Sequence, residues 1–214
     1  MQEDTHQLHA MRHSMAHILA AAVQTLHPAA QFGVGPVIEN GFYYDIRLNQ
    51  PLSDKDLSQV KKTMYKIISS DLPIERFEWP IEKALEYFRN INQIYKVELL
   101  EDLQQYGTTS VKEISKEDIG IDSTVDKITT VSLYKIGDFV DLCRGPHLDR
   151  TGQAGVFKLD KLAGAYWRGD ETRDQLQRIY ALPFETEPDL DPPPTPAADA
   201  STRDHPTPAN HPAP

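Results

Sequence analysis

The sequence predicts an α+β fold in which helices pack on a mostly antiparallel sheet. Helical and strand patterns alternate along the 214 residues, without the regular strand–helix–strand rhythm of a parallel sheet. A two-strand hairpin is indicated early in the chain, and such tight turns join antiparallel strands. The composition, 39% hydrophobic and 25% charged, is that of a globular protein large enough to bury a core.

The first elements follow from spacing and turn residues. Apolar side chains recur at helical spacing over about residues 9–26, and Pro28 ends this helix. The segment GVGPVIENGFYYDIRL, residues 33–48, predicts two short strands joined through residues 39–41, which are Glu-Asn-Gly. A second helix is expected over residues 53–69, because its first residue is a serine, which favours the N-cap.

The middle of the chain predicts a strand at residues 74–79 and two helices, at residues 80–88 and 95–103. The first of these helices opens on proline, which is well tolerated at a first helical position. Residues 107–126 are polar and show no period, so we expect an irregular insertion there. Three further strands are expected at residues 129–134, 155–162 and 176–182.

The last part of the chain differs in composition from the rest. Residues 188–214 consist largely of Pro, Ala, Asp, Thr and His and hold nine of the sixteen prolines. Such a segment has too few apolar residues to bury a core. We therefore expect one ordered unit over residues 1–187, followed by a disordered, Pro-rich, acidic tail.

The net charge is −10, and about half of it lies from residue 185 onward, where six acidic residues face one arginine. This argues against a protein that holds nucleic acid mainly by neutralising phosphates. A nucleic-acid substrate would need local basic patches or help from a partner. No apolar run has the length of a membrane span, and the polar, acidic N-terminus is not a secretory signal. One cysteine is consistent with a reducing cytoplasm.

Two pairs of residues are candidates for a functional site. His13 and His17 are four apart in a predicted helix, so they lie on one face. Cys143 and His147 flank a Gly-Pro turn that folds the chain back. If the fold joins these pairs, the four groups can bind a metal or move protons. The alternative is that each pair consists of polar residues with no shared role.

Three further residues have both a functional and an ordinary interpretation. Lys96 is a lone cation among apolar residues, either a solvated helix residue or a contact for a substrate. Asp141 either orients a histidine or binds an amine, or is a simple loop acid. Tyr44 follows another tyrosine in a strand, so one of the two enters the core and the other can line a pocket. No Walker loop or GxGxxG motif is present.

Several long strings resemble the editing module of bacterial threonyl-tRNA synthetases over about residues 9–184. They are RHSMAHILAAAVQTLHP, FGVGPVIENGFYYDI, YKVELL, GDFVDLCRGPHLDRTG and FKLDKLAGAYWRGDETRDQLQRIYA. The resemblance implies a sheet wrapped around a long central helix, with a smaller α/β subdomain at about residues 50–128. It implies hydrolysis of Ser-tRNA(Thr), serine wrongly esterified to threonine tRNA, by an aminoacyl-tRNA hydrolase. The implied catalytic residues are His13, His17, Lys96, Cys143 and His147, and the implied substrate-binding residues are Tyr44 and Asp141.

Two alternatives stay open at this point. The module resembles part of a split synthetase, whose separate chain would supply aminoacylation and tRNA binding, since the ATP-using domain is not found here. Related alanyl-type modules use zinc, for which His13, His17, Cys143 and His147 are the candidate ligands. Threonyl-type modules generally work without metal, so we expect no cofactor and metal-independent hydrolysis. The implied partner is mischarged tRNA(Thr), the implied location is the cytoplasm, and no membrane is involved.

Overall fold

The computed structural model describes residues 2–108 and 128–184. It confirms the α+β class, because this part of the chain forms four α-helices and two antiparallel sheets. The predicted tail lies outside the described residues, and so does most of the predicted insertion at residues 107–126. In the two described ranges we find no helix with the length and hydropathy of a membrane span.

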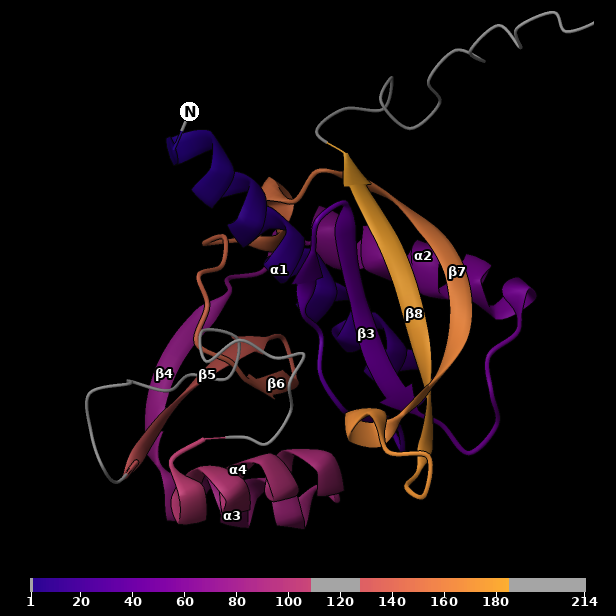
Figure 1. The fold of residues 1–214 in the computed structure, drawn as a ribbon. Helices are drawn as coiled ribbons and strands as arrows, with labels where there is room; N and C mark the ends of the chain where they lie inside the picture. Colours follow the sequence, from indigo (N-terminus) through magenta and orange to yellow (C-terminus); the bar gives the residue numbers. More distant parts are fainter. Residues whose placement is uncertain (1, 109–127, 185–214) are drawn as a thin grey trace, which may run out of the picture.

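The larger sheet has the strand order β1-β3-β8-β7, and β2 also pairs with β3 (Figure 1). Every pairing in it is antiparallel. The predicted hairpin is confirmed, since Ile38 lies opposite Gly41 across a tight turn. The strands are β1 (Gln31–Phe32), β2 (Val37–Ile38), β3 (Gly41–Arg47), β7 (Val156–Tyr166) and β8 (Gln175–Phe184).

Helix α1 (Gln2–Leu26) is the long helix at the centre of the first core, with the larger sheet on one side and α2 (Asp54–Ser69) on another (Figure 1). Its residues 13–23 are all buried, and many are alanines, which allow neighbouring elements to approach closely. The helix ends before Pro28 as expected. It begins at Gln2, earlier than the predicted residue 9. The sequence did not indicate this early start, because the first residues are polar and show no apolar period.

Helix α2 begins after Ser53, as its N-cap role predicts. The backbone N–H of Ser53 donates to Asp56 Oδ2 at 2.8 Å, and its hydroxyl donates to the same oxygen at 2.7 Å. Val60 and Met64 point from this helix into the first core, toward α1 and β7. Burying an apolar side chain of this size contributes about 1.5–3 kcal/mol, so the amphipathic spacing suffices to dock the helix.

A second, smaller sheet has the order β4-β5-β6 and lies beside two further helices (Figure 1). Its apolar face packs on these helices to form a second core, which also takes in Trp167 and Leu176 from the larger sheet's region. The division at about residues 50–128 stays a prediction, although α2 itself packs in the first core. The elements are β4 (Glu75–Pro80), α3 (Ile81–Asn90), α4 (Ile94–Tyr106), β5 (Thr130–Ile136) and β6 (Phe139–Leu142).

Strand β6 is not among the predicted elements. It pairs with β5 through a two-residue turn, Gly137-Asp138, with Ile136 opposite Phe139. The string IGDF carries the signal, since Gly-Asp between apolar residues is a hairpin pattern. The strand has only four residues, and their apolar alternation is too short to stand out. Its importance is that it places Asp141 beside α1 and leads directly into Cys143.

Candidate functional site

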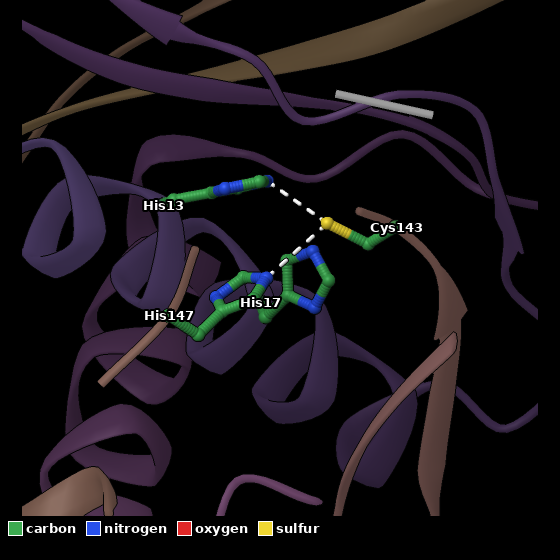
Figure 2. A group of neighbouring side chains, drawn as sticks. All are labelled: His13, His17, Cys143 and His147. Carbon is green, nitrogen blue, oxygen red and sulfur yellow. Dashed lines mark hydrogen bonds between the residues drawn. The ribbon is translucent and has the colours of Figure 1, made fainter. Parts of the chain in front are cut away.

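Helix α1 supplies two histidines to the interior of the protein. His13 and His17 are each 2% exposed, and their ring centroids are 5.3 Å apart. The remaining faces of this stretch pack in the first core, so the helix cannot rotate without exposing apolar side chains. The predicted i, i+4 arrangement therefore fixes both rings on one side of the helix, facing β6 (Figure 2).

The chain after β6 supplies the other pair. Cys143 is 1% exposed, and the backbone N–H of Gly145 donates to its sulfur at 3.3 Å. The Gly145–Pro146 peptide is cis, and Gly145 has a φ of +84°, which favours glycine. A Cβ at this position would also collide with the hydroxyl of Tyr134. The turn brings His147 back over Cys143 (Figure 2).

The structure brings all four groups together in what we call the histidine–cysteine cluster (His13, His17, Cys143 and His147). Cys143 Sγ lies 3.1 Å from His13 Nε2 and 3.2 Å from His147 Nε2 (Figure 2). One ligand atom from each residue lies within 4.8 Å of the other three. Of the four, only His147 is partly exposed, so the cluster opens to its surroundings at that residue.

A second group, the buried triad (Tyr44, Lys96 and Asp141), adjoins this cluster. Lys96 Nζ lies 2.5 Å from Asp141 Oδ1 and donates to the Tyr44 hydroxyl at 3.0 Å. The Tyr44 hydroxyl donates to Asp141 Oδ2, and the Leu142 N–H donates to Oδ1 at 2.8 Å. Lys96 is only 3% exposed, so its interpretation as a solvated helix residue is wrong. Sequence spacing could not show that α4 turns this residue inward.

Tyr44 is the tyrosine of its pair that faces the site. It is fully buried and packs on Phe32, with ring centroids 5.9 Å apart. Tyr43 points to the other face of β3, where it meets Tyr180 and Arg178. The alternation expected of a strand is therefore observed, although both rings are buried.

The electrostatics of the site favour neutral imidazoles. Burial lowers the pKa of His17 to about 3, with Asp141 opposing this shift and His13 and Lys96 adding to it. Burial and the neighbouring histidines also hold the pKa of His147 well below its usual value. At neutral pH the 3.5 Å contact between His17 Nε2 and Asp141 Oδ2 is therefore a dipolar contact and not an ion pair.

The carboxyl of the triad stays ionised. Burial alone would raise the pKa of Asp141, but Lys96, His17 and the hydrogen bond from Tyr44 outweigh it, so the pKa is lowered. Burial and the same carboxylate raise the pKa of Tyr44, which keeps its hydroxyl protonated. The triad thus combines a fixed ammonium, a carboxylate and a hydroxyl beside neutral imidazoles. Such an arrangement can bind a polar substrate, polarise a carbonyl and hold a water.

The ligand types of the cluster also fit a zinc ion. Imidazole nitrogen and thiolate sulfur are usual zinc ligands, and the four residues converge on one point from two segments. The outer nitrogen of His147 contacts the Ser14 hydroxyl at 3.2 Å, which matches the outer partner that a metal-binding histidine commonly has. The site thus has groups suited both to proton transfer and to metal binding.

Two contributors to the site were not predicted. Tyr134 lies opposite Asp141 on β5 and packs its ring 4.3 Å from that of His147. Ser14 lies between the two histidines of α1 and is fully buried. The sequence signal for Ser14 is a serine within an apolar helical stretch, since a buried hydroxyl needs a hydrogen-bond partner. The sequence does not show which residue that partner is.

The comparisons with known proteins find one domain and one group of enzymes that this chain resembles. The model of the threonyl and alanyl tRNA synthetase second additional domain matches residues 131–180, which run from β5 to the end region of β8 and include Asp141, Cys143 and His147. The threonine–tRNA ligase of Acetivibrio thermocellus is 44% identical over 196 residues, covering 92% of this chain and 27% of that enzyme.

Other threonine–tRNA ligases match in the same way. That of Azoarcus sp. is 43% identical over 195 residues, covering 91% of this chain and 27% of the enzyme. That of Clostridioides difficile is 46% identical over 189 residues, covering 88% of this chain and 26% of the enzyme. The chain thus spans about a quarter of the length of these relatives. Residues 131–180 thus match the second additional domain of threonyl and alanyl tRNA synthetases, and most of the chain is similar to one part of threonine–tRNA ligases.

Proposed function

We propose that this chain hydrolyses the ester of mischarged Ser-tRNA(Thr), as an editing module that does not itself aminoacylate. The observation that carries the proposal is the burial of neutral imidazoles directly beside the Tyr44–Lys96–Asp141 triad. The triad can grip an aminoacyl group while the imidazoles hold the water that attacks it. The similarity to threonine–tRNA ligases suggests the substrate class, a tRNA of the kind on which those enzymes act.

In this proposal His17 holds the water. Asp141 Oδ2 lies 3.5 Å from His17 Nε2, and because a carboxylate only accepts hydrogen bonds, this contact favours a proton on that nitrogen. His17 Nδ1 is then an acceptor, and it makes no hydrogen bond with any residue that the structure describes. A buried acceptor of this kind can orient a water toward an ester carbonyl. Positioning of this kind contributes about 10²–10⁴-fold to a rate.

The triad provides the electrostatic part of the mechanism. The Lys96 ammonium can stabilise the negative charge that develops on the carbonyl oxygen or on the departing 2′- or 3′-oxygen of the tRNA. The Asp141 carboxylate can pair with the substrate ammonium. Tyr44 keeps both in place, since its hydroxyl contacts each of them. Cys143 forms a wall of the site, and no acyl-enzyme is required.

A separate hydrolytic site is useful because a binding site alone discriminates poorly between serine and threonine. Threonine exceeds serine by one methyl group, and a pocket discriminates such a group by about 1–3 kcal/mol, or roughly 10–200-fold. Errors in a synthetic site are reduced further when another site destroys the smaller product. The centroids of the three imidazole rings in the cluster lie 4.2, 4.4 and 5.3 Å apart, and so close a group suits the exclusion of an extra methyl.

Hydrolysis in this proposal does not depend on a metal. If zinc binds, the histidine–cysteine cluster would hold it, and the ion would supply an acidified water. A tetrahedral ion held by all four groups would have no open position for that water. The imidazoles can hold water without it, and the triad supplies the positive charge. The convergence of the four ligands nevertheless supports a zinc-dependent alternative, which the removal of metal tests.

The negative charge of the chain bears on its partners. With an overall charge of −10, long-range attraction does not hold tRNA to this chain. We therefore propose that a separate synthetase chain in the cytoplasm presents the mischarged end of tRNA(Thr).

A time course of serine release from Ser-tRNA(Thr) tests the proposal, with the protein, with its His13→Ala variant and with the His27→Ala variant. His13 contacts Cys143 in the cluster, whereas His27 follows the end of α1, away from the cluster. We expect release by the wild type and by His27→Ala, and a loss of about 10²–10⁴-fold for His13→Ala. Equal rates in all three samples would remove the cluster from the mechanism.

A further inference from the structure

Ser14 holds a buried contact that the proposed reaction has not used. It lies on α1 between the two histidines and is fully buried. Its hydroxyl oxygen accepts a hydrogen bond from the Leu148 N–H at 2.8 Å. The same oxygen lies 3.2 Å from His147 Nδ1. One side chain thus joins the central helix to the chain just after the Gly-Pro turn.

The direction of the contact with His147 follows from the single proton of a hydroxyl. Serines and threonines in or at the end of helices commonly donate that proton to the carbonyl four residues back. Thr25 of α1 does so to Ala21 at 2.9 Å, and Ser70, just after α2, does so to Lys66 at 2.8 Å. Ser14 makes no such bond with any residue in the described ranges. A buried hydroxyl proton requires an acceptor, and His147 Nδ1 is the acceptor within reach.

We infer that Ser14 is a positioning residue that fixes His147 as the tautomer with its proton on Nε2. That proton points at Cys143 Sγ, 3.2 Å away. The sulfur then receives N–H groups from His147 and Gly145, and its own proton has His13 Nε2 as an acceptor at 3.1 Å. A directed chain of hydrogen bonds runs from Ser14 through His147 and Cys143 to His13.

This assignment divides the roles of the histidines, and its catalytic meaning rests on the proposed function. His147 has its Nδ1 occupied by a donor and its Nε2 protonated, so it can only donate into the site. The acceptor that holds the water is then His17 Nδ1. Without the Ser14 hydroxyl, a neutral His147 ring can place its proton on either nitrogen. The hydrogen-bond direction through the cluster would no longer be fixed.

Nitrogen NMR of ¹⁵N-histidine-labelled protein tests the inference directly, on the full chain freed of metal with a chelator and verified by elemental analysis. The metal-free state matters because a metal on Nε2 would force the proton onto Nδ1. The His147 signals are assigned by comparison with His147→Gln. We expect a protonated Nε2 and an unprotonated Nδ1 in the wild type. A proton on Nδ1 would overturn the inference, whatever any variant does.

Two variants then separate positioning from packing. Ser14→Ala should shift His147 toward a mixture of tautomers and reduce kcat by about 10–100-fold, the usual effect of losing an outer partner, with little change in KM. Ser132→Ala is the matched control, since it removes a buried hydroxyl that bonds the Cys143 carbonyl at 2.7 Å and no imidazole. It should leave the His147 tautomer unchanged. An unchanged tautomer in folded Ser14→Ala would refute the positioning role.

The NMR result does not depend on activity, so the two proposals fail separately. If the tautomer is as expected but no tested ester is hydrolysed, the proposed function fails while Ser14 keeps its assigned role. If Ser14→Ala does not fold, the His147 tautomer in the wild-type spectrum alone decides whether the inference holds.

Discussion

The ammonium of Lys96 lies 2.5 Å from a carboxylate oxygen of Asp141, and both side chains are buried. Lys96 comes from α4, which packs in the second core, and Asp141 comes from β6. Asp141 also contacts Tyr44 and His17, which belong to the elements of the first core. Asp141 therefore joins Lys96 of α4 to Tyr44 and His17 of the first core, at the place where the candidate site lies.

Breaking this pair should be costly for stability as well as for activity. Lys96→Met leaves a buried carboxylate without its cation, and such a loss costs about 3–5 kcal/mol. The double variant Lys96→Met/Asp141→Asn has no buried charge at this point and should recover much of that loss. Urea unfolding of both variants measures this, with Lys62→Met on the exposed face of α2 as the control, expected within about 0.5 kcal/mol of wild type.

If the double variant is no more stable than Lys96→Met, the two groups do not act as a pair. If it is stable but inactive, the charges serve the chemistry and not only the fold. The comparison separates these two roles, which a single alanine variant would mix.

Gly145→Ala should disturb the turn that carries His147. A Cβ there meets the Tyr134 hydroxyl, and the φ of +84° already disfavours other residues. Gly169→Ala is the matched control, since its φ is +69° and nothing lies within 4 Å of its Cβ position. The control should lose about 1–2 kcal/mol from backbone strain alone. Gly145→Ala should lose more and also lose hydrolysis, measured by thermal unfolding and ester release.

Equal losses of stability in both glycine variants would show that Tyr134 moves aside freely. That result would contradict a tightly built wall behind His147.

Stability should fall as the solution is acidified. Because the pKa of His17 is about 3 in the folded protein and 6.5 in the unfolded chain, the unfolded chain binds more protons between these values. Folding therefore loses up to about 1.4 kcal/mol per pH unit from this group as pH falls through that window. His147 shifts in the same direction. Urea midpoints at pH 7, 6 and 5 measure the slope, which should be shallower in His17→Gln.

An identical slope in the variant would mean that His17 titrates normally in the folded protein. A fall in stability above pH 4 also distinguishes the histidines from Asp141. The pKa of Asp141 is lowered, so its effect on stability is seen only at more acidic pH.

Parts of this structure follow from the sequence, and others depend on tertiary packing. The convergence of His13, His17, Cys143 and His147 is expected from two compact spacings together with the resemblance to threonyl-type editing modules, and it is observed. The burial of Lys96 was not, because a lysine on a helix shows nothing of the carboxylate it meets across the fold. The contact of Ser14 with His147 spans 133 positions and has no local pattern. Short β6 escaped the periodicity that marks longer strands.

Removal of metal should leave hydrolysis intact. Dialysis against a chelator, with metal content checked by elemental analysis, should change the rate of serine release by less than about twofold. The physical reason is that neutral imidazoles can hold the water and Lys96 can supply the positive charge. Stoichiometric zinc whose removal abolishes hydrolysis, with recovery on adding zinc back, would instead establish the alanyl-type mechanism.

The proposed function assigns one ester, Ser-tRNA(Thr), as the substrate of this site. The most direct measurement incubates the protein with Ser-tRNA(Thr), Thr-tRNA(Thr) and Ser-tRNA(Ala) in parallel and follows the loss of each ester. We predict rapid loss of Ser-tRNA(Thr), while Thr-tRNA(Thr) is spared at least about 10-fold because of its extra methyl. Persistence of Ser-tRNA(Thr), alone and with a threonine–tRNA ligase added as partner, or equal loss of Thr-tRNA(Thr), would contradict the proposed function.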